Sequence, residues 1–204
     1  MKKNNCCPTN GHRIHGISSE SFLNAKEILE ALHLEGNETF LDAGCGDGHI
    51  AMEALNILND NAQIYAIDNY EASIIDLQEE IREKNIKNMT ALVSDISEHI
   101  KLEDELIDMC LLVNVFHGFK ARNTTSEAIS ELKRITKTGG KIAIMDYKRI
   151  HAPHGPKYEV RSTIEELEEM FKEHKLKKVH LNYAIGEDIA EDNGKSHFLI
   201  IFEK

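Results

Sequence analysis

Short apolar stretches alternate along the chain with longer segments in which apolar residues recur at helical spacing. The short stretches predict five successive β-strands, at residues 39–41, 63–67, 89–93, 106–115 and 141–145. Two further stretches, 177–183 and 197–202, predict a closing pair of strands. The almost unbroken apolar run of 106–115 is typical of a central parallel strand that is covered on both faces.

Helices are predicted between the strands from the spacing of their apolar side chains. Three of them span residues 19–34, 50–58 and 71–85. Two more are expected to begin at capping boxes, Thr124-x-x-Glu127 and Ser162-x-x-Glu165. The first of these should end at the paired glycines Gly139-Gly140, and the second near His174.

This alternation predicts an α/β fold with a doubly wound, mostly parallel seven-stranded sheet that an antiparallel hairpin closes. We expect one domain over residues 19–204, preceded by a flexible arm at 1–18. In such sheets ligands bind beyond the carboxyl ends of the strands, at the point where the strand order reverses. The residues expected there are Gly44, Asp68, Asp95, Asn114 and Asp146.

The charge and cysteine content narrow the classes of partner and the compartment. With 24 Lys and Arg against 35 Asp and Glu, the formal net charge is −11, which disfavours a nucleic-acid partner. No apolar run is long enough to cross a bilayer, so we expect no membrane partner. Four cysteines and no apolar leader favour a reducing cytoplasm. We expect a monomer or a homodimer.

The turn after the first strand, Asp42-Ala43-Gly44-Cys45-Gly46-Asp47-Gly48, has the composition of a ligand-binding loop. Glycines let a strand bend sharply into a helix while its backbone touches a ligand, and the helix N-terminus offers unpaired N–H groups. The dinucleotide fingerprint would place its third glycine at position 49, which is His49. The spacing therefore disfavours NAD and FAD.

Asp68 follows Gly48 by twenty residues, at the end of the second predicted strand. A carboxylate at this place accepts hydrogen bonds from both ribose hydroxyls of an adenosyl group. Alone, an aspartate after a strand is often only a turn residue. With the glycine turn, it indicates a nucleoside site.

The stretch Phe40–Gly48 resembles the first motif of class I S-adenosylmethionine (SAM)-dependent methyltransferases, and most closely the small-molecule group that includes quinone-biosynthesis enzymes. The resemblance continues through Asp68, Ser94-Asp95-Ile96, the strand at 107–112 and the segment 132–140, and covers about residues 20–147. It departs at Thr138, where the family usually has proline. It implies a Rossmann-like methyltransferase fold with SAM as the cofactor.

The resemblance also implies roles for single residues. Gly44 and Gly46 would face the methionine part of SAM, and Asp42 would brace the turn or bind the amino group. The implied cofactor set is Asp42, Gly44, Cys45, Gly46, Asp68, Asn69, Asp95, Ile96 and Asn114. Within it, Asp68 would bind the ribose, Asp95 and Ile96 would bind the adenine, and Asn114 would lie beneath the methyl group.

Methyl transfer needs alignment of the nucleophile, and needs a general base only where the nucleophile must lose a proton. His117, three residues after Asn114, is the candidate base; the alternative is a rim histidine that shapes the pocket or packs against a loop. The residues expected to form the substrate pocket for a small-molecule acceptor are His12, His15, Tyr147 and His154.

Three alternatives stay open. Cys6 and Cys7 stand near His12 and His15, but adjacent cysteines rarely chelate zinc, so we expect no metal site. A non-catalytic protein that binds SAM or a related nucleoside would carry the same turn. An NAD-linked oxidoreductase is disfavoured by His49. We therefore predict a methyltransferase for a small-molecule acceptor.

Overall fold

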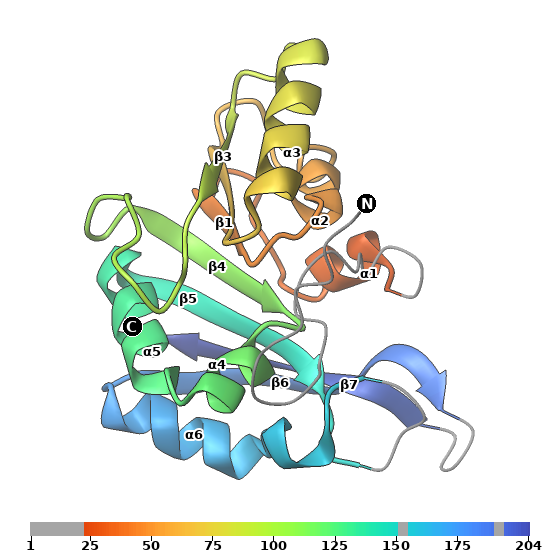
Figure 1. The fold of residues 1–204 in the computed structure, drawn as a ribbon, viewed down its shortest axis with the longest axis vertical. Coiled ribbons are helices and arrows are strands. Elements are labelled where there is room, and N and C mark those ends of the chain that lie inside the picture. Colours follow the sequence, from red (N-terminus) through yellow and green to blue (C-terminus); the bar gives the residue numbers. More distant parts are fainter. Residues whose placement is uncertain (1–22, 151–154, 190–193) are drawn as a thin grey trace.

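The structure, a computed structural model, describes residues 23–150, 155–189 and 194–204 of the 204-residue chain. A seven-stranded sheet with the order β3-β2-β1-β4-β5-β7-β6 forms its centre (Figure 1). The strands are β1 (Phe40–Ala43), β2 (Ile64–Asp68), β3 (Met89–Val93), β4 (Ile107–Val113), β5 (Thr136–Tyr147), β6 (Lys177–Ile189) and β7 (Gly194–Glu203). Strands β1 to β5 are parallel, and β7 is antiparallel to both of its neighbours. The predicted fold class is confirmed.

Helices cover both faces of the sheet and divide the core into two apolar layers (Figure 1). On one face lie α1 (Ala25–Glu30), α2 (His49–Ala54) and α3 (Glu71–Glu83). On the other lie α4 (Phe116–Arg122), α5 (Thr125–Ile135) and α6 (Ile164–Glu173), with the 3-10 helix η1 (Tyr158–Val160) before α6. Across the part of the chain that the structure describes, no helix combines the length and the apolarity needed to cross a membrane.

The order of the strands creates one edge at which several elements meet. The chain moves outward from β1 to β2 and β3 and then returns to β4 on the other side of β1, so the strand order reverses between β1 and β4. The carboxyl ends of all five parallel strands lie at this edge. The start of β7 lies there too, because His197 pairs with Tyr147 at the end of β5.

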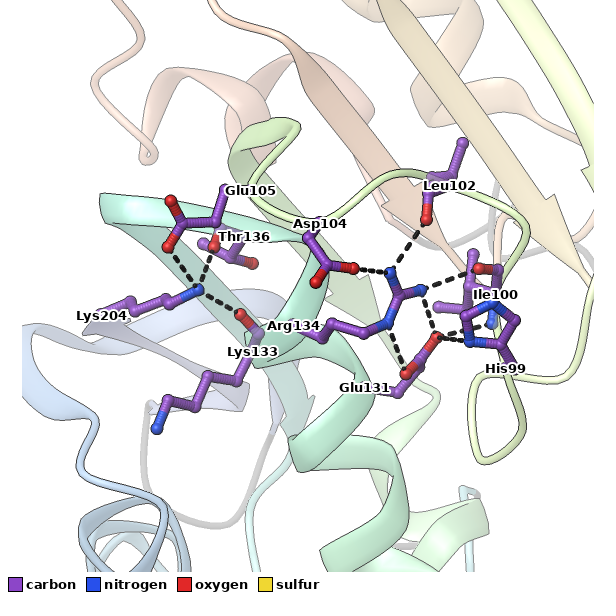
Figure 2. Close-up of polar contacts among 10 residues, drawn as sticks. All are labelled: His99, Ile100, Leu102, Asp104, Glu105, Glu131, Lys133, Arg134, Thr136 and Lys204. Carbon is purple, nitrogen blue, oxygen red and sulfur yellow. Dashed lines mark hydrogen bonds and ion pairs between the residues drawn. The ribbon is translucent and has the colours of Figure 1, made fainter.

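A charged network anchors the loop that leads into β4 (Figure 2). Arg134 on α5 binds Glu131, Asp104 and two backbone carbonyl groups of this loop. Lys204 donates to two carbonyl oxygens at the end of α5, which satisfies acceptors that a helix terminus otherwise leaves open. The loop and α5 are thereby fixed on one face of the sheet.

Both predicted capping boxes differ from the structure. Thr124 precedes α5, but its side chain makes no capping hydrogen bond, and its hydroxyl is buried without a partner among the described residues. The box before α6 is one residue later than predicted: Thr163 and Glu166 bond reciprocally, whereas Ser162 does not cap. The cause is the extended backbone of Thr163, which lets its oxygen reach the N–H of Glu166.

Several predicted boundaries were also wrong. Helix α5 ends at Ile135 and not at the paired glycines, because Thr136 already pairs with Ile107 as the first residue of β5. Helix α4 was not predicted: it is short and holds Gly118, which weakens a helical pattern. The described part of the first predicted helix is helical only over α1, the second helix ends at Ala54, and both closing strands are longer than predicted.

Candidate active site

The glycine turn after β1 needs its glycines for different reasons. All three adopt a positive φ, at 82° for Gly44, 57° for Gly46 and 84° for Gly48. A Cβ on Gly44 would lie 2.4 Å from Val115, and one on Gly48 would lie 2.6 Å from Leu77. A Cβ on Gly46 would meet no described atom within 4 Å. The outer glycines therefore permit close packing, while the middle one leaves its backbone open to a ligand.

Asp42, at the end of β1, braces this turn from below. Its Oδ2 accepts a hydrogen bond from the N–H of Ala51 in α2 at 3.1 Å. Burial raises the pKa of Asp42 to about 7, although His49 acts in the opposite direction. The N–H of His49 is likewise bonded, to Asp47. The expectation that the N-terminus of α2 offers unpaired N–H groups is therefore wrong for Ala51 and His49.

Asp68 joins the end of β2 to the middle of the turn. Its Oδ2 accepts from the N–H of Gly46 at 2.9 Å, and its Oδ1 accepts from the N–H of Tyr70 at 2.8 Å. Each carboxylate oxygen keeps a further lone pair, so the group can still accept from two hydroxyls. Asn69 lies next to it, exposed.

Asp95, beyond the end of β3, is held by two neighbours. Its Oδ1 accepts from the N–H and the hydroxyl of Ser97, and its Oδ2 accepts from Arg122 at 3.0 Å. Burial tends to raise the pKa of Asp95, but the bonds from Ser97 and Arg122 outweigh it and hold the pKa below its usual value. Ile96 beside it is buried. Sequence reasoning missed Arg122, because it comes from the unpredicted helix α4.

His117 forms a buried pair with Asp146. The His117 Nδ1 lies 2.9 Å from one carboxylate oxygen, and the His117 N–H donates to the other. Burial favours a raised pKa for Asp146, but His117 outweighs it and holds this pKa below its usual value. An ionised carboxylate only accepts, so Nδ1 carries the proton and Nε2 is the basic nitrogen of the neutral ring.

A second histidine, His197 at the start of β7, was not among the predicted site residues. It is fully buried, its Nε2 lies 2.9 Å from Asn114 Oδ1, and its ring packs on Tyr147 at 4.1 Å between centroids. Burial lowers the pKa of His197 to about 4 and raises that of Tyr147 to about 12. The polar pair Ser196-His197 ahead of the apolar run 198–202 was a usable signal, since an antiparallel strand brings its amino end to the ligand edge.

The cysteines in the described part, Cys45 and Cys110, are free and buried. Burial raises the pKa of both Cys45 and Cys110, which keeps them as unreactive thiols. Cys45 nevertheless belongs to the turn, since its N–H donates to Ile67.

Several predicted features lie outside the described residues: the arm at 1–18 with its cysteines, His12, His15 and His154. Among the residues that the structure describes, no group of three or more His, Cys, Asp or Glu side chains is arranged to hold a metal ion. The described site therefore consists of the glycine turn, the carboxylates at or just beyond the ends of β1 to β3, and the polar groups around Asn114.

Comparisons with known proteins agree with this geometry. A family model described as a methyltransferase domain matches residues 34–203. The chain belongs to this family. A SAM-dependent methyltransferase from Aquifex aeolicus has the same fold, with a TM-score of 0.76 and 22% identity over 92% of this chain and 93% of that one. The 4+2 cyclase SpnF also has this fold, with a TM-score of 0.70 and 15% identity over 88% and 79% of the two chains.

A curated relative of this methyltransferase domain is a ubiquinone/menaquinone biosynthesis C-methyltransferase from Cupriavidus pinatubonensis, 25% identical over 122 residues. The match covers 60% of this chain and 48% of the relative, so the chain spans about half the length of the curated relative. Family and fold imply SAM as the cofactor. The open backbone at Gly46 and the spare lone pairs of Asp68 fit such a ligand.

Proposed function

We propose that the protein transfers a methyl group from SAM to a small-molecule acceptor by in-line displacement. The observation that carries this proposal is the turn at Gly46, whose backbone is open to a ligand and is bonded to Asp68. Bound SAM would supply an electrophilic methyl group on its sulfonium. The task of the chain is then to hold the donor, align the acceptor and exclude water.

Two carboxylates whose positions are fixed by hydrogen bonds would hold the methyl donor. Asp68 would accept from the ribose hydroxyls, with Asn69 beside it, and Asp95 would accept from the adenine amino group next to Ile96. Arg122 and Ser97 support this role of Asp95, because they keep its carboxylate charged and fixed. Gly44, Cys45 and Gly46 would face the methionine part of the donor.

We propose His117 as the general base for acceptors that must lose a proton. Asp146 supports this role because its carboxylate fixes the ring with Nδ1 protonated, which leaves Nε2 as the proton-accepting atom. Acceptors that are already deprotonated would not need this step. Tyr147, packed on His197 next to Asp146, would line the acceptor pocket.

The acceptor class, the compartment and the assembly state are proposed more broadly. The Cupriavidus relative is named for quinone biosynthesis, which favours a small organic acceptor over a macromolecule. The formal net charge of −11 disfavours RNA. We propose the cytoplasm as the compartment, consistent with the free thiols of Cys45 and Cys110, and a monomer or homodimer.

The test is calorimetric titration of the full chain with SAM, S-adenosylhomocysteine and NAD, followed by radiolabelled methyl transfer to a metabolite pool. Binding of the first two ligands, no binding of NAD, and label in a small organic product are the expected results. Failure to bind SAM and S-adenosylhomocysteine would refute the proposal. Binding without any turnover would favour a non-catalytic SAM-binding protein. The cyclase SpnF has the same fold, and its name is not that of a methyltransferase.

A further inference from the structure

A chain of hydrogen bonds runs from the closing hairpin to the end of β4. The N–H of Glu187 donates to Ser196 Oγ at 3.0 Å, and Ser196 Oγ lies 2.6 Å from His197 Nδ1. On the other side of the ring, His197 Nε2 lies 2.9 Å from Asn114 Oδ1. These four residues connect β6, β7 and β4 across the sheet edge at which ligands bind.

The direction of this chain follows from its first link. A backbone N–H only donates, so Ser196 Oγ accepts from Glu187. Among the described residues, the acceptor in reach of the Ser196 hydroxyl hydrogen is His197 Nδ1. An Nδ1 that accepts carries no proton, so the neutral ring is protonated at Nε2 and donates to Asn114 Oδ1.

The reverse direction would be costly. It would leave the hydroxyl hydrogen of Ser196, a residue that is 3% exposed, without an acceptor among the described residues. A doubly protonated ring is also disfavoured, because burial holds the pKa of His197 at about 4. Above about pH 5 the ring is therefore neutral, with a single favoured tautomer.

The position of His197 is closely defined by its neighbours. Gly186 has a φ of 90°, and a Cβ on it would lie 2.5 Å from His197 Nδ1. Tyr147 packs on the ring at 4.1 Å. Close packing of this kind leaves the ring a single position. The Nε2–H group therefore points at Asn114 Oδ1 in a fixed direction.

Asn114, directly after the end of β4, is the last residue in this chain of hydrogen bonds. Its φ of 58° is left-handed, and its backbone N–H donates to Met145. Because Oδ1 accepts from His197, the two N–H groups of Nδ2 are the remaining donors, and they make no hydrogen bond within the described residues. The next residue, Val115, packs against Gly44, so the backbone that carries this amide runs next to the glycine turn.

We propose that His197 is a positioning residue that turns the Asn114 amide so that Nδ2 donates to an oxygen of the bound ligand. The identity of that ligand rests on the proposed function. The matching chemistry is a carbonyl, carboxylate or phenolate oxygen, which accepts two N–H bonds well. This oxygen belongs either to the methyl acceptor or to the carboxylate of SAM.

Nitrogen NMR of the histidine side chains tests the direction of the chain without any ligand. At about pH 7 we expect His197 to carry its proton on Nε2. A predominant Nδ1–H form overturns the inference. A protein that shows the expected form but binds neither SAM nor S-adenosylhomocysteine refutes the proposed function and leaves this direction in place. A predominant Nδ1–H form in a protein that still binds S-adenosylhomocysteine refutes the inference but not the proposed function.

The Asn114 side-chain NH2 signals then identify the source of the oxygen. They should shift with S-adenosylhomocysteine but not with 5′-methylthioadenosine, which lacks the carboxylate, if the oxygen belongs to the donor. They should shift with 4-nitrophenolate added to the protein loaded with S-adenosylhomocysteine if it belongs to the acceptor. A shift with neither probe overturns the inference.

Substitutions separate positioning from a merely structural role. His197→Gln keeps an N–H near the place of Nε2, whereas His197→Leu removes it. We expect roughly tenfold weaker binding of the shifting probe in the Leu variant and about wild-type binding in the Gln variant. Equal loss in both overturns the inference.

Two further variants complete the set. The matched control is His180→Leu, since His180 lies on the same hairpin, in edge-to-face contact with His33 and not bonded to Asn114. Ser196→Ala serves if the Leu variant does not fold. It keeps the ring, removes the link that selects the tautomer, and should reduce the Nε2–H population. An unchanged Nε2–H population in Ser196→Ala contradicts the inference.

Discussion

Asp68 has two tasks, because the oxygens proposed to accept from a ribose also hold the backbone of Gly46 and Tyr70. Asp68→Ala should weaken SAM binding by about 1.5–3 kcal/mol, the range for lost hydrogen bonds to a charged group. Calorimetry measures this loss, and a thermal melt reports the expected loss of stability. The matched control is Asp60→Ala, an exposed aspartate just before β2. Unchanged SAM affinity in folded Asp68→Ala contradicts the assigned role.

Asp42 makes the stability of the fold depend on pH. Its folded pKa of about 7 exceeds its ordinary value of 3.8, so the folded chain binds the extra proton between those values. Its contribution to stability is therefore lost as the pH rises from about 4 to about 7, by a total on the order of 4 kcal/mol. Urea titrations of Asp42→Asn across this range should show a smaller loss with rising pH than wild type does. Equal slopes would contradict this assignment.

His197 acts on stability in the opposite direction. Its folded pKa of about 4 lies below its ordinary 6.5, so the unfolded chain binds the extra proton between these values. Stability is therefore lost as the pH falls from about 6.5 to about 4. Denaturation of His197→Gln should show less acid destabilisation than wild type does. The ionisable groups that face the ring are Asp146, Glu187, His117 and Arg161.

At the scale of the element, the start of α6 separates two neighbouring hydroxyl residues. Thr163 accepts from the N–H of Glu166, so Thr163→Ala should cost about 1 kcal/mol of folding free energy. Ser162 is buried, and its hydroxyl has no partner in the described part of the chain, so Ser162→Ala should be neutral or slightly stabilising. Chemical denaturation of the two variants measures both values. Equal destabilisation would contradict the capping assignment.

The elements show how far the sequence alone predicts this fold. Five parallel strands and the closing hairpin were predicted, because buried strands in such sheets are marked by apolar runs. Short helices and caps were less predictable. Helix α4 carries little periodicity, and whether Ser162 or Thr163 caps α6 depends on backbone angles that neither side chain reveals. The start of β5 at Thr136 is set by pairing with Ile107, a contact made across 29 residues of chain.

The donor side of the site was more predictable than the acceptor side. Asp42, Asp68 and Asp95 each follow an apolar strand, so their convergence follows from the parallel sheet alone. His197 lies near the start of its strand and reaches the same edge only because β7 runs antiparallel. Its contact with Asn114 joins residues 83 positions apart, which no local pattern contains.

At the scale of the whole molecule, ligand binding should stabilise the fold as one unit. The proposed donor contacts lie on the ends of β1, β2, β3 and β4, which are neighbours in one sheet. SAM at about a hundred times its Kd should add about 2.7 kcal/mol to the free energy of unfolding. Differential scanning calorimetry with and without SAM measures this gain. Asp68→Ala should reduce it, and a melting transition insensitive to SAM would contradict it.

The reversal of strand order between β1 and β4 has an evolutionary consequence. Most groups proposed to hold the donor come from the first half of the chain, up to Ile96, whereas His117 and Tyr147, proposed for the acceptor side, come from the second half. Mutations around His117 and Tyr147 can therefore accumulate while these donor contacts are inherited unchanged. A lineage with this layout can change the compounds that it methylates without rebuilding its reagent site.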